Sequence, residues 1–146
     1  MKTTKPYIYI VDDNDVSLKI IQKKIKEILD CNIRTYTNAE DCYRTVQFRT
    51  PDLILSDYYL DSMYNQRMNG DDLLNKVKYY NHNIPVIIYS STESFKLAVR
   101  LVKLGADDFI PRNDDFIPEL LEVVEKHFKN VDSKPFLQDF LSKFDW

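Results

Sequence analysis

The sequence predicts an α/β domain built on a doubly wound, five-stranded parallel sheet. Short apolar runs alternate five times with stretches whose apolar residues recur at helical spacing. This alternation is typical of parallel strands covered by helices on both faces. The length also fits, because 146 residues, 44% of them hydrophobic, can bury a sizeable core within one domain. Crossovers between parallel strands are right-handed, which leaves few topologies, and we expect the strand order 2-1-3-4-5.

The first strand is predicted at Tyr7–Val11, a short apolar run rich in β-forming residues. Asn14 or Asp15 can cap the helix that follows, because a side-chain oxygen there accepts a free backbone N–H. A second short strand is predicted at Ile33–Tyr36. The apolar positions of the first helix repeat at helical spacing, at Leu18, Ile21, Ile25 and Ile28.

The next segments continue the alternation. Asn38 can cap a second helix that runs through Phe48. The third strand, Leu53–Ser56, follows Pro51. Gly70 opens the third helix, which carries the apolar residues Leu73, Leu74 and Val77.

The rest of the domain adds two more strands and two more helices. The fourth strand is Val86–Tyr89, and Ser90–Glu93 lead into a helix that ends at Leu104 and Gly105. Glycine is a natural residue directly after a helix. Asp108–Ile110 is a weak fifth strand. The last helix has Pro118 near its start and runs through Phe128, with an apolar face formed by Leu121, Val124 and Phe128.

The composition excludes several classes of function. The chain has only two glycines, where average usage of about 7% would give roughly ten, so Gly-rich phosphate and dinucleotide loops are excluded. A net charge of −3 provides no basic stripe for direct nucleic-acid binding. Cys31 and Cys42 lack metal-binding spacing and are interpreted as small half-buried thiols in a reducing compartment. No apolar run approaches the roughly 18 residues of a membrane span, and we expect a cytoplasmic protein with no membrane contact.

Polar residues directly follow four of the five predicted strands. In doubly wound sheets, ligands bind at the carboxyl ends of the strands, at the point where the strand order reverses. Because the first and third strands are neighbours in the expected order, three carboxylates converge there, and their mutual repulsion calls for a cation such as Mg²⁺. The residues concerned are Asp12, Asp13, Asp57, Ser90, Ser91 and Arg112.

This arrangement suits phosphoryl transfer. A carboxylate beside Mg²⁺ can attack a phosphoryl group and form an aspartyl-phosphate, while the metal, a hydroxyl and a cation share the phosphoryl oxygens. Each residue also has a simpler reading. Asp12 and Asp13 can cap the first helix, Asp57 can be a loop carboxylate, and Arg112 can be a surface cation. Ser90 and Ser91 can likewise be helix caps. Their joint placement at strand ends favours the functional reading.

The chain resembles the receiver domain of two-component response regulators, which has a flavodoxin-like fold. The resemblance covers roughly residues 6–129 and rests on four motifs in the expected order and spacing: YIYIVDDND, DLILSD, PVIIYSS and LGADDFIPR. It implies a receiver domain over residues 1–129, followed by a C-terminal extension over residues 130–146. A receiver is not an enzyme beyond catalysing its own phosphorylation and dephosphorylation.

The resemblance implies a role for each matching position. Asp57 matches the phospho-accepting aspartate, Asp13 the direct Mg²⁺ ligand, and Asp12 its acidic companion. The backbone carbonyl of Tyr59 matches a further metal ligand. Two positions match the residues that report phosphorylation in the family. Ser90 matches the Ser/Thr that bonds the phosphoryl group, and Phe109 matches the switch aromatic, usually Tyr or Phe. Phospho-donors in the family are histidine kinases, phosphotransfer proteins or small acyl phosphates, and some members form homodimers.

The chain departs from the family after the fifth strand. Arg112 stands where the family has a lysine, in IPRN rather than the usual V-K-P, and Asn113 replaces the usual proline. Arginine keeps the charge but differs in reach and in the geometry of its donors. Our hypothesis is that Arg112 still contacts the phosphoryl group, with altered switching. The alternative is an Arg112 that points to solvent.

A second departure lies after Asp57, in the sequence YYLDSMYNQRMNG. Asp61 replaces a family proline, and about five residues are inserted before Met68. The polar insert Ser62–Arg67 fits a tolerated surface loop or, alternatively, a partner contact. Tyr59 is bulky and close to the site, and we predict that it shields the acyl phosphate from water.

The tail Asn130–Trp146 is expected to form a short amphipathic helix that packs back on the receiver or docks on a partner. Its apolar residues are Phe136, Leu137, Phe140, Leu141 and Phe144. We expect a stand-alone receiver whose output is contact with a protein target. The family implies that this contact uses the fourth helix, the fifth strand and the last helix.

Three other classes of protein compete with a phosphorylated receiver. A pseudo-receiver would bind partners without phosphorylation, and the replacement of lysine by Arg112 makes it a stronger rival than the phosphatase. A haloacid dehalogenase-like phosphatase uses D-x-D, which Asp13-Asn14-Asp15 matches superficially, but its lysine is missing and Asp57 would be unexplained. A flavin binder is disfavoured because Asp12 and Asp13 would repel the flavin phosphate.

Overall fold

The computed structural model describes residues 4–60, 68–92 and 94–129. The predicted loop insert Ser62–Arg67 and the predicted tail helix in Asn130–Trp146 lie outside these residues. The strands are β1 (Tyr7–Val11), β2 (Asn32–Tyr36), β3 (Leu53–Asp57), β4 (Val86–Ser90) and β5 (Asp108–Pro111). The helices are α1 (Asp15–Ile28), α2 (Ala39–Val46), α3 (Gly70–Tyr80), α4 (Phe95–Leu104) and α5 (Phe116–Lys129).

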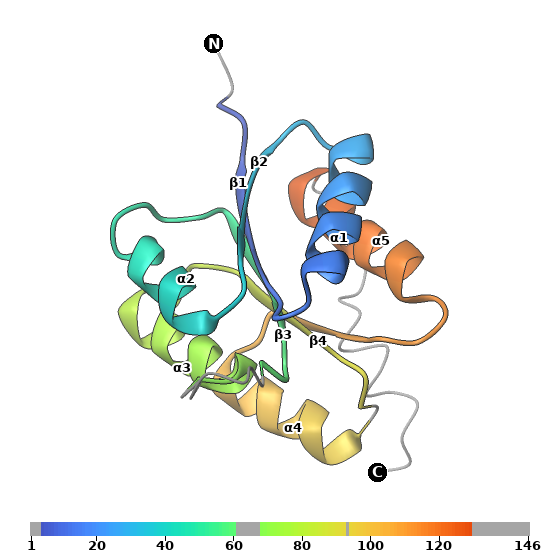
Figure 1. The fold of residues 1–146 in the computed structure, drawn as a ribbon. Coiled ribbons are helices and arrows are strands. Elements are labelled where there is room, and N and C mark those ends of the chain that lie inside the picture. Colours follow the sequence, from blue (N-terminus) through green and yellow to red (C-terminus); the bar gives the residue numbers. More distant parts are fainter. Residues whose placement is uncertain (1–3, 61–67, 93, 130–146) are drawn as a thin grey trace.

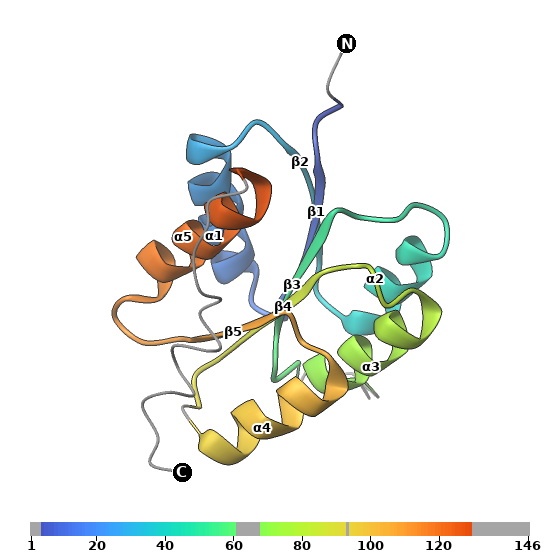
Figure 2. The ribbon, with the colours of Figure 1, turned by 180° about the vertical axis from the view of Figure 1, so that it is seen from behind.

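The sheet is parallel throughout and has the predicted order β2-β1-β3-β4-β5. Helices α1 and α5 cover one face, and α2, α3 and α4 cover the other (Figures 1 and 2). Successive strand side chains alternate between the two faces, so that Ile8 and Ile10 pack under α1 and α5 while Tyr9 and Val11 pack under α2 to α4. The predicted fold class is therefore confirmed. Within the described residues, no helix combines the length and the apolar character needed to cross a bilayer.

Three strands extend one residue beyond their predicted ends, to Asp57, Ser90 and Pro111. Hydrogen bonds between neighbouring strands continue at these positions. For example, the N–H of Tyr58 donates to the carbonyl of Tyr89 at 2.8 Å. Similarly, the N–H of Arg112 donates to the carbonyl of Ser90 at 2.7 Å. The residues expected to carry the chemistry are thus held by the sheet itself and not by free loops.

The helix caps correct part of the sequence interpretation. Asn14 and Asn38 cap α1 and α2, as predicted. Helix α4 is capped by Ser94, whose side chain accepts the N–H of Leu97, so the reading of Ser90 and Ser91 as its caps is wrong. Helix α2 ends at Val46 and not at Phe48. The chain turns there through a tighter bond, in which the N–H of Phe48 donates to the carbonyl three residues earlier.

Both glycines occupy places where a side chain would be strained. Gly105 follows α4 with a φ of 93°, in the left-handed region. Gly70 begins α3 so close to β3 that an added Cβ would lie 2.4 Å from the carbonyl oxygen of Asp57. The N–H of Gly70 donates to the carbonyl of Tyr58 at 2.8 Å. The start of α3 is therefore packed directly on the backbone that carries Asp57.

Candidate metal and phosphoryl site

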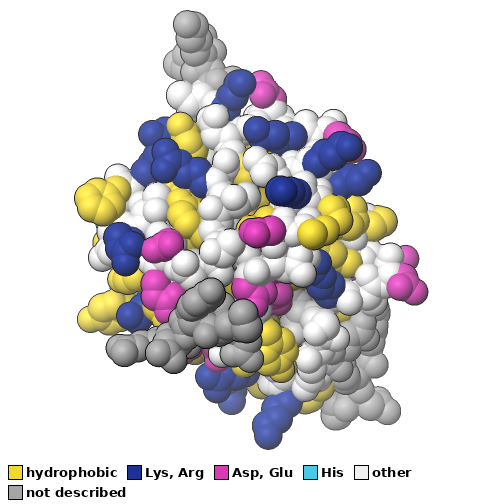
Figure 3. All heavy atoms as spheres, viewed as in Figure 1, with side chains coloured by type: hydrophobic (Ala, Val, Ile, Leu, Met, Phe, Trp, Pro, Cys, Tyr) yellow, Lys and Arg dark blue, Asp and Glu magenta, His cyan; other side chains and the backbone are white. Residues whose placement is uncertain are grey.

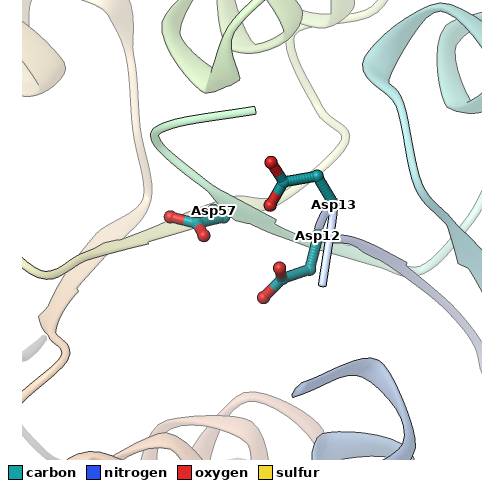
Figure 4. Close-up of side chains that lie close together, drawn as sticks. All are labelled: Asp12, Asp13 and Asp57. Carbon is teal, nitrogen blue, oxygen red and sulfur yellow. The ribbon is translucent and has the colours of Figure 1, made fainter. Parts of the chain in front are cut away.

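Three carboxylates meet at the carboxyl edge of the sheet, as predicted. Asp12 and Asp13 follow β1, Asp57 ends β3, and each offers an oxygen within 4.8 Å of the other two (Figure 4). The register explains the meeting, because Val11 pairs with Ser56 and places the next residues of the two strands side by side. Figure 3 shows acidic side chains gathered near the centre of this face. Clustered carboxylate oxygens are hard ligands, which suit Mg²⁺.

The electrostatics of Asp57 favour a cation at this cluster. Burial, followed by the nearby charge of Asp12, raises the pKa of the Asp57 carboxyl from 3.8 to about 7. Arg112 and the N–H of Tyr59 lower the same pKa, whereas Asp13 raises it. The result is a carboxylate that is costly to ionise without a further positive charge. A divalent cation would supply that charge.

Asp12 is held from three directions. Its side chain is 1% exposed. The Oδ1 atom accepts the N–H of Asn14 at 2.9 Å, and the Oδ2 atom accepts both the Tyr89 hydroxyl at 2.7 Å and the Arg112 Nη1 at 3.1 Å. The capping role belongs to Asn14, whose side chain accepts the N–H of Ser17. The reading of Asp12 as the helix cap is therefore wrong.

Arg112 turns inward, towards the site. Its guanidinium donates to Asp12 and to the hydroxyl of Ser17 in α1. It also lies over two aromatic rings, 5.5 Å from the centroid of Tyr89 and 5.1 Å from that of Phe116. The alternative that Arg112 points to solvent is therefore wrong, and the reason is that the buried charge of Asp12 requires a partner.

The two predicted switch residues are both fully buried. Ser90 ends β4, and its Oγ accepts the N–H of Thr92 at 3.1 Å. An oxygen that accepts one hydrogen bond still has its own proton to donate. Phe109 lies in β5 within the core cluster that contains Leu97 and Leu101 of α4. A change in the position of Phe109 would therefore alter the packing of α4.

Tyr59 connects the site to a cavity beside α4. Its backbone N–H bonds to Asp57, while its side chain is 45% exposed. The ring packs edge-to-face on Tyr58, with 4.8 Å between centroids. Both rings line a cavity of about 640 Å³ that runs along α4 and includes Arg100 and Lys103. No contact of the Tyr59 carbonyl tests the predicted metal-ligand role, which stays a prediction.

Two residues of the site were not predicted from the sequence. Tyr89 is one of them, and a tyrosine at the end of a buried strand is a usable signal, since its hydroxyl needs a partner inside the protein. Ser17 is the other. It is 8% exposed and lies on the buried side of α1, next to Leu18, where a polar residue on an apolar face is also unusual.

The fold and the carboxylate cluster define a class: a doubly wound α/β domain with three carboxylates that could hold a metal ion at the carboxyl ends of β1 and β3. The chain belongs to the response regulator receiver domain family, whose model matches residues 8–125. The resemblance noted from the sequence is thus confirmed. The match does not favour the phosphatase, flavin-binding or pseudo-receiver alternatives.

Curated relatives are larger than this chain. The DNA-binding transcriptional regulator NtrC of Escherichia coli (strain K12) is 28% identical over 119 residues, covering 82% of this chain and 24% of that protein. The nitrogen assimilation regulatory protein NtrX of Azorhizobium caulinodans is 31% identical over 117 residues, covering 79% of this chain and 25% of that protein. The chain therefore spans about a quarter of the length of these relatives.

A solved structure agrees with the fold. The signal receiver domain of a putative LuxO repressor protein from Vibrio parahaemolyticus superposes with a TM-score of 0.76 at 24% identity. The superposition covers 87% of this chain and 92% of that one. At this identity the likeness shows the shared architecture.

Proposed function

We propose that this domain accepts a phosphoryl group on Asp57 and thereby switches a protein-binding surface, in the cytoplasm. The observation that carries the proposal is the convergence of three carboxylates within 4.8 Å, beside a buried hydroxyl and an inward-turned arginine. The donor set fits Mg²⁺, with Asp12, Asp13, Asp57 and the carbonyl of Tyr59 as the residues that would hold it. Bound Mg²⁺ would offset the negative charge that the phosphoryl oxygens bring to the cluster.

In the proposed step, a carboxylate oxygen of Asp57 attacks the phosphorus atom of the donor. The bond from phosphorus to the donor's leaving atom breaks, and its electron pair stays with the donor. Ser90 then donates a hydrogen bond from its hydroxyl to one phosphoryl oxygen. Arg112 lies close enough to Asp57 to lower the pKa of that carboxyl, and its positive charge attracts a second phosphoryl oxygen. The mixed anhydride formed on Asp57 is the switched state.

A histidine kinase or a phosphotransfer protein is the proposed donor. Helix α1 starts next to the carboxylates and exposes two apolar side chains one turn apart, Val16 at 65% and Ile20 at 46%. Exposed apolar residues beside a reactive site suit a docking protein. Small acyl phosphates need no such surface, and we expect them to react as well.

The proposed output is contact with a protein target through α4. This helix carries Lys96, Arg100 and Lys103 and no acidic residue. Lys and Arg side chains project where α4 lies, at the bottom of Figure 3. Ser90 is one end of the β4–α4 connection and Phe109 packs under α4, so phosphorylation can shift α4 between two positions. A target with an acidic surface would complement it.

The proposal is tested by incubating the chain with Mg²⁺ and acetyl phosphate and following its mass. We expect the addition of one phosphoryl group, which is lost without Mg²⁺ and in Asp57→Asn. Asp30→Asn is the matched control, because Asp30 is an exposed carboxylate paired with Lys5. A chain that stays unmodified by acetyl phosphate and does not respond to beryllofluoride would be a pseudo-receiver, contrary to the proposal.

A further inference from the structure

Tyr89 has no part in the function proposed above, yet its hydroxyl reaches the carboxylate cluster. The side chain is fully buried near the end of β4. Its hydroxyl donates to the Oδ2 atom of Asp12 at 2.7 Å, across a sequence separation of 77 residues. Burial and the charge of Asp12 raise its pKa well above the ordinary value, so the hydroxyl keeps its proton and remains a donor.

The ring of Tyr89 also contacts the second partner of Asp12. The guanidinium of Arg112 lies 5.5 Å from the ring centroid and donates to the same Oδ2 atom. Phe116 packs against Tyr89 from α5, with 5.1 Å between ring centroids, and lies under the same guanidinium. One tyrosine therefore fixes Asp12 by a hydrogen bond and supports Arg112 by ring contact.

We propose that Tyr89 is a positioning residue for the metal site, holding the Asp12 carboxylate in the orientation that Mg²⁺ binding requires. This inference rests on the proposed function. Asp12 is 1% exposed, and its carboxylate is held by hydrogen bonds from within the protein. Without the hydroxyl, Arg112 alone would set the position of the Oδ2 atom, and the carboxylate would have to be reoriented when the metal binds. Groups that orient a metal-binding carboxylate typically contribute 10- to 100-fold to metal affinity.

Loss of the hydroxyl has an opposing effect, because a carboxylate with fewer donors is a stronger metal ligand. That effect is limited here, since Arg112 and the N–H of Asn14 still hold Asp12. We therefore expect the loss of orientation to dominate. Tyr89→Phe should weaken Mg²⁺ binding by roughly tenfold while keeping the ring that packs on Phe116.

The test is the affinity of the unmodified chain for Mg²⁺, measured by titration calorimetry. Tyr9→Phe is the matched control, because Tyr9 is equally buried and its hydroxyl donates at 2.7 Å to the backbone carbonyl of Arg49, a group outside the carboxylate cluster. Tyr9→Phe should leave Mg²⁺ affinity unchanged. Unchanged or tighter binding in Tyr89→Phe would overturn the proposal.

A double-mutant cycle separates positioning from a general packing defect. In an Asp12→Ala background the hydroxyl has no carboxylate to orient, so adding Tyr89→Phe should change Mg²⁺ affinity by less than about twofold. An equally large effect in that background would contradict the proposal. Tyr89→Leu, which lacks both the hydroxyl and the ring beneath Arg112, provides a second variant and should lose at least as much Mg²⁺ affinity as Tyr89→Phe.

The rate of modification by acetyl phosphate provides an independent readout. In Tyr89→Phe, the Mg²⁺ concentration for half-maximal rate should rise about tenfold, while the rate at saturating Mg²⁺ changes much less. A wild-type chain that is never modified would refute the proposed function. A wild-type chain that is modified, with Tyr89→Phe equal to it in Mg²⁺ dependence, would refute only the role of Tyr89.

Discussion

Asp12 directly follows β1 and Asp57 ends the neighbouring strand β3, but the two carboxylates have different electrostatic surroundings. Asp12 has an arginine and two further hydrogen-bond donors, whereas Asp57 has burial and two nearby negative charges. The first carboxylate is therefore neutralised within the protein. The Asp57 carboxylate is not neutralised in this way, so that a bound cation or a covalent modification would stabilise it. A raised pKa of this kind is expected of a phosphoryl acceptor.

This contrast predicts how stability depends on pH in the absence of divalent cations. The pKa of Asp57 is raised from 3.8 to about 7 in the folded state. Its contribution to folding stability is thus fully present below about pH 4 and is lost as the pH rises through about 7. Asp57→Asn removes this loss and should raise the free energy of unfolding at pH 8 by about 1–2 kcal/mol, with no difference near pH 4.

Urea unfolding of both chains across this pH range checks the prediction. Asp30→Asn, which removes an exposed carboxylate, should follow the wild-type profile. Parallel profiles for the wild type and Asp57→Asn would contradict the raised pKa.

Arg112 leads to a prediction about charge and geometry. Arg112→Ala leaves Asp12 buried without its cation and should lower the free energy of unfolding by about 3 kcal/mol, as well as slowing phosphorylation. Arg112→Lys keeps the charge, but a single ammonium lacks the fork that bridges Asp12 and Ser17. It should recover most of the stability and only part of the rate. Chemical denaturation and acetyl phosphate kinetics measure the two effects, and an Arg112→Ala chain that matched the wild type in both would exclude the role.

Tyr59 is predicted to slow the loss of the phosphoryl group. Its backbone N–H bonds to Asp57 and its side chain is 45% exposed, so the ring can limit the approach of water to this part of the site. Tyr59→Ala should shorten the half-life of the aspartyl-phosphate several-fold, as followed by mass after removal of the donor. Tyr79→Ala removes a 94% exposed tyrosine from α3 and is the control. Equal half-lives for Tyr59→Ala and the wild type would count against shielding.

At the scale of elements, the positions of strands and helices were predictable because each follows from local pattern. Buried parallel strands are short apolar runs, and Asn14 and Asn38 mark helix starts by a local hydrogen bond. What could not be predicted depended on partners distant in sequence. The extension of β4 to Ser90 comes from its pairing with β5, and the bond from Tyr89 to Asp12 spans three strands.

The junction of β3 and α3 gives a prediction at this scale. A methyl group at Gly70 would meet the Asp57 carbonyl oxygen at 2.4 Å, so Gly70→Ala must displace either α3 or the acceptor. We expect a loss of about 1–3 kcal/mol in the free energy of unfolding together with weaker Mg²⁺ binding. Gly105→Ala is the control, because it strains a left-handed turn remote from the carboxylates and should cost about 1 kcal/mol without changing Mg²⁺ affinity. Normal Mg²⁺ affinity in Gly70→Ala would show that the acceptor had not moved.

At the scale of the whole molecule, the site joins both layers of the fold. Arg112 contacts Ser17 of α1 and lies over the ring of Phe116 in α5. Asp57 adjoins the start of α3, and Phe109 packs under α4. A ligand at the carboxyl edge of the sheet therefore contacts elements from both cores. Its binding should stabilise the molecule as one unit.

Mg²⁺ should accordingly raise the melting temperature, and the effect should depend on pH. A ligand at 100 times its dissociation constant adds about 2.7 kcal/mol to the free energy of unfolding. Because the proton on Asp57 competes with the metal below about pH 7, the increase in melting temperature should be larger at pH 8 than at pH 6. Asp57→Asn should remove this pH difference. Thermal scans with and without Mg²⁺ test it, and an equal increase at both pH values in the wild type would contradict the competition.

The hydrogen bonds around the start of α3 have a consequence for protein engineering. The N–H of Leu60 donates to the side chain of Asn69 at 3.0 Å, and the N–H of Gly70 donates to the carbonyl of Tyr58. Two hydrogen bonds therefore link the residues after β3 to the residues at the start of α3. Lengthening a closed loop costs only about 0.6 kcal/mol for each doubling of its length. These two bonds therefore hold the described residues on either side together, so a variant with a reporter sequence inserted between Leu60 and Asn69 should keep the Mg²⁺ affinity of the wild type.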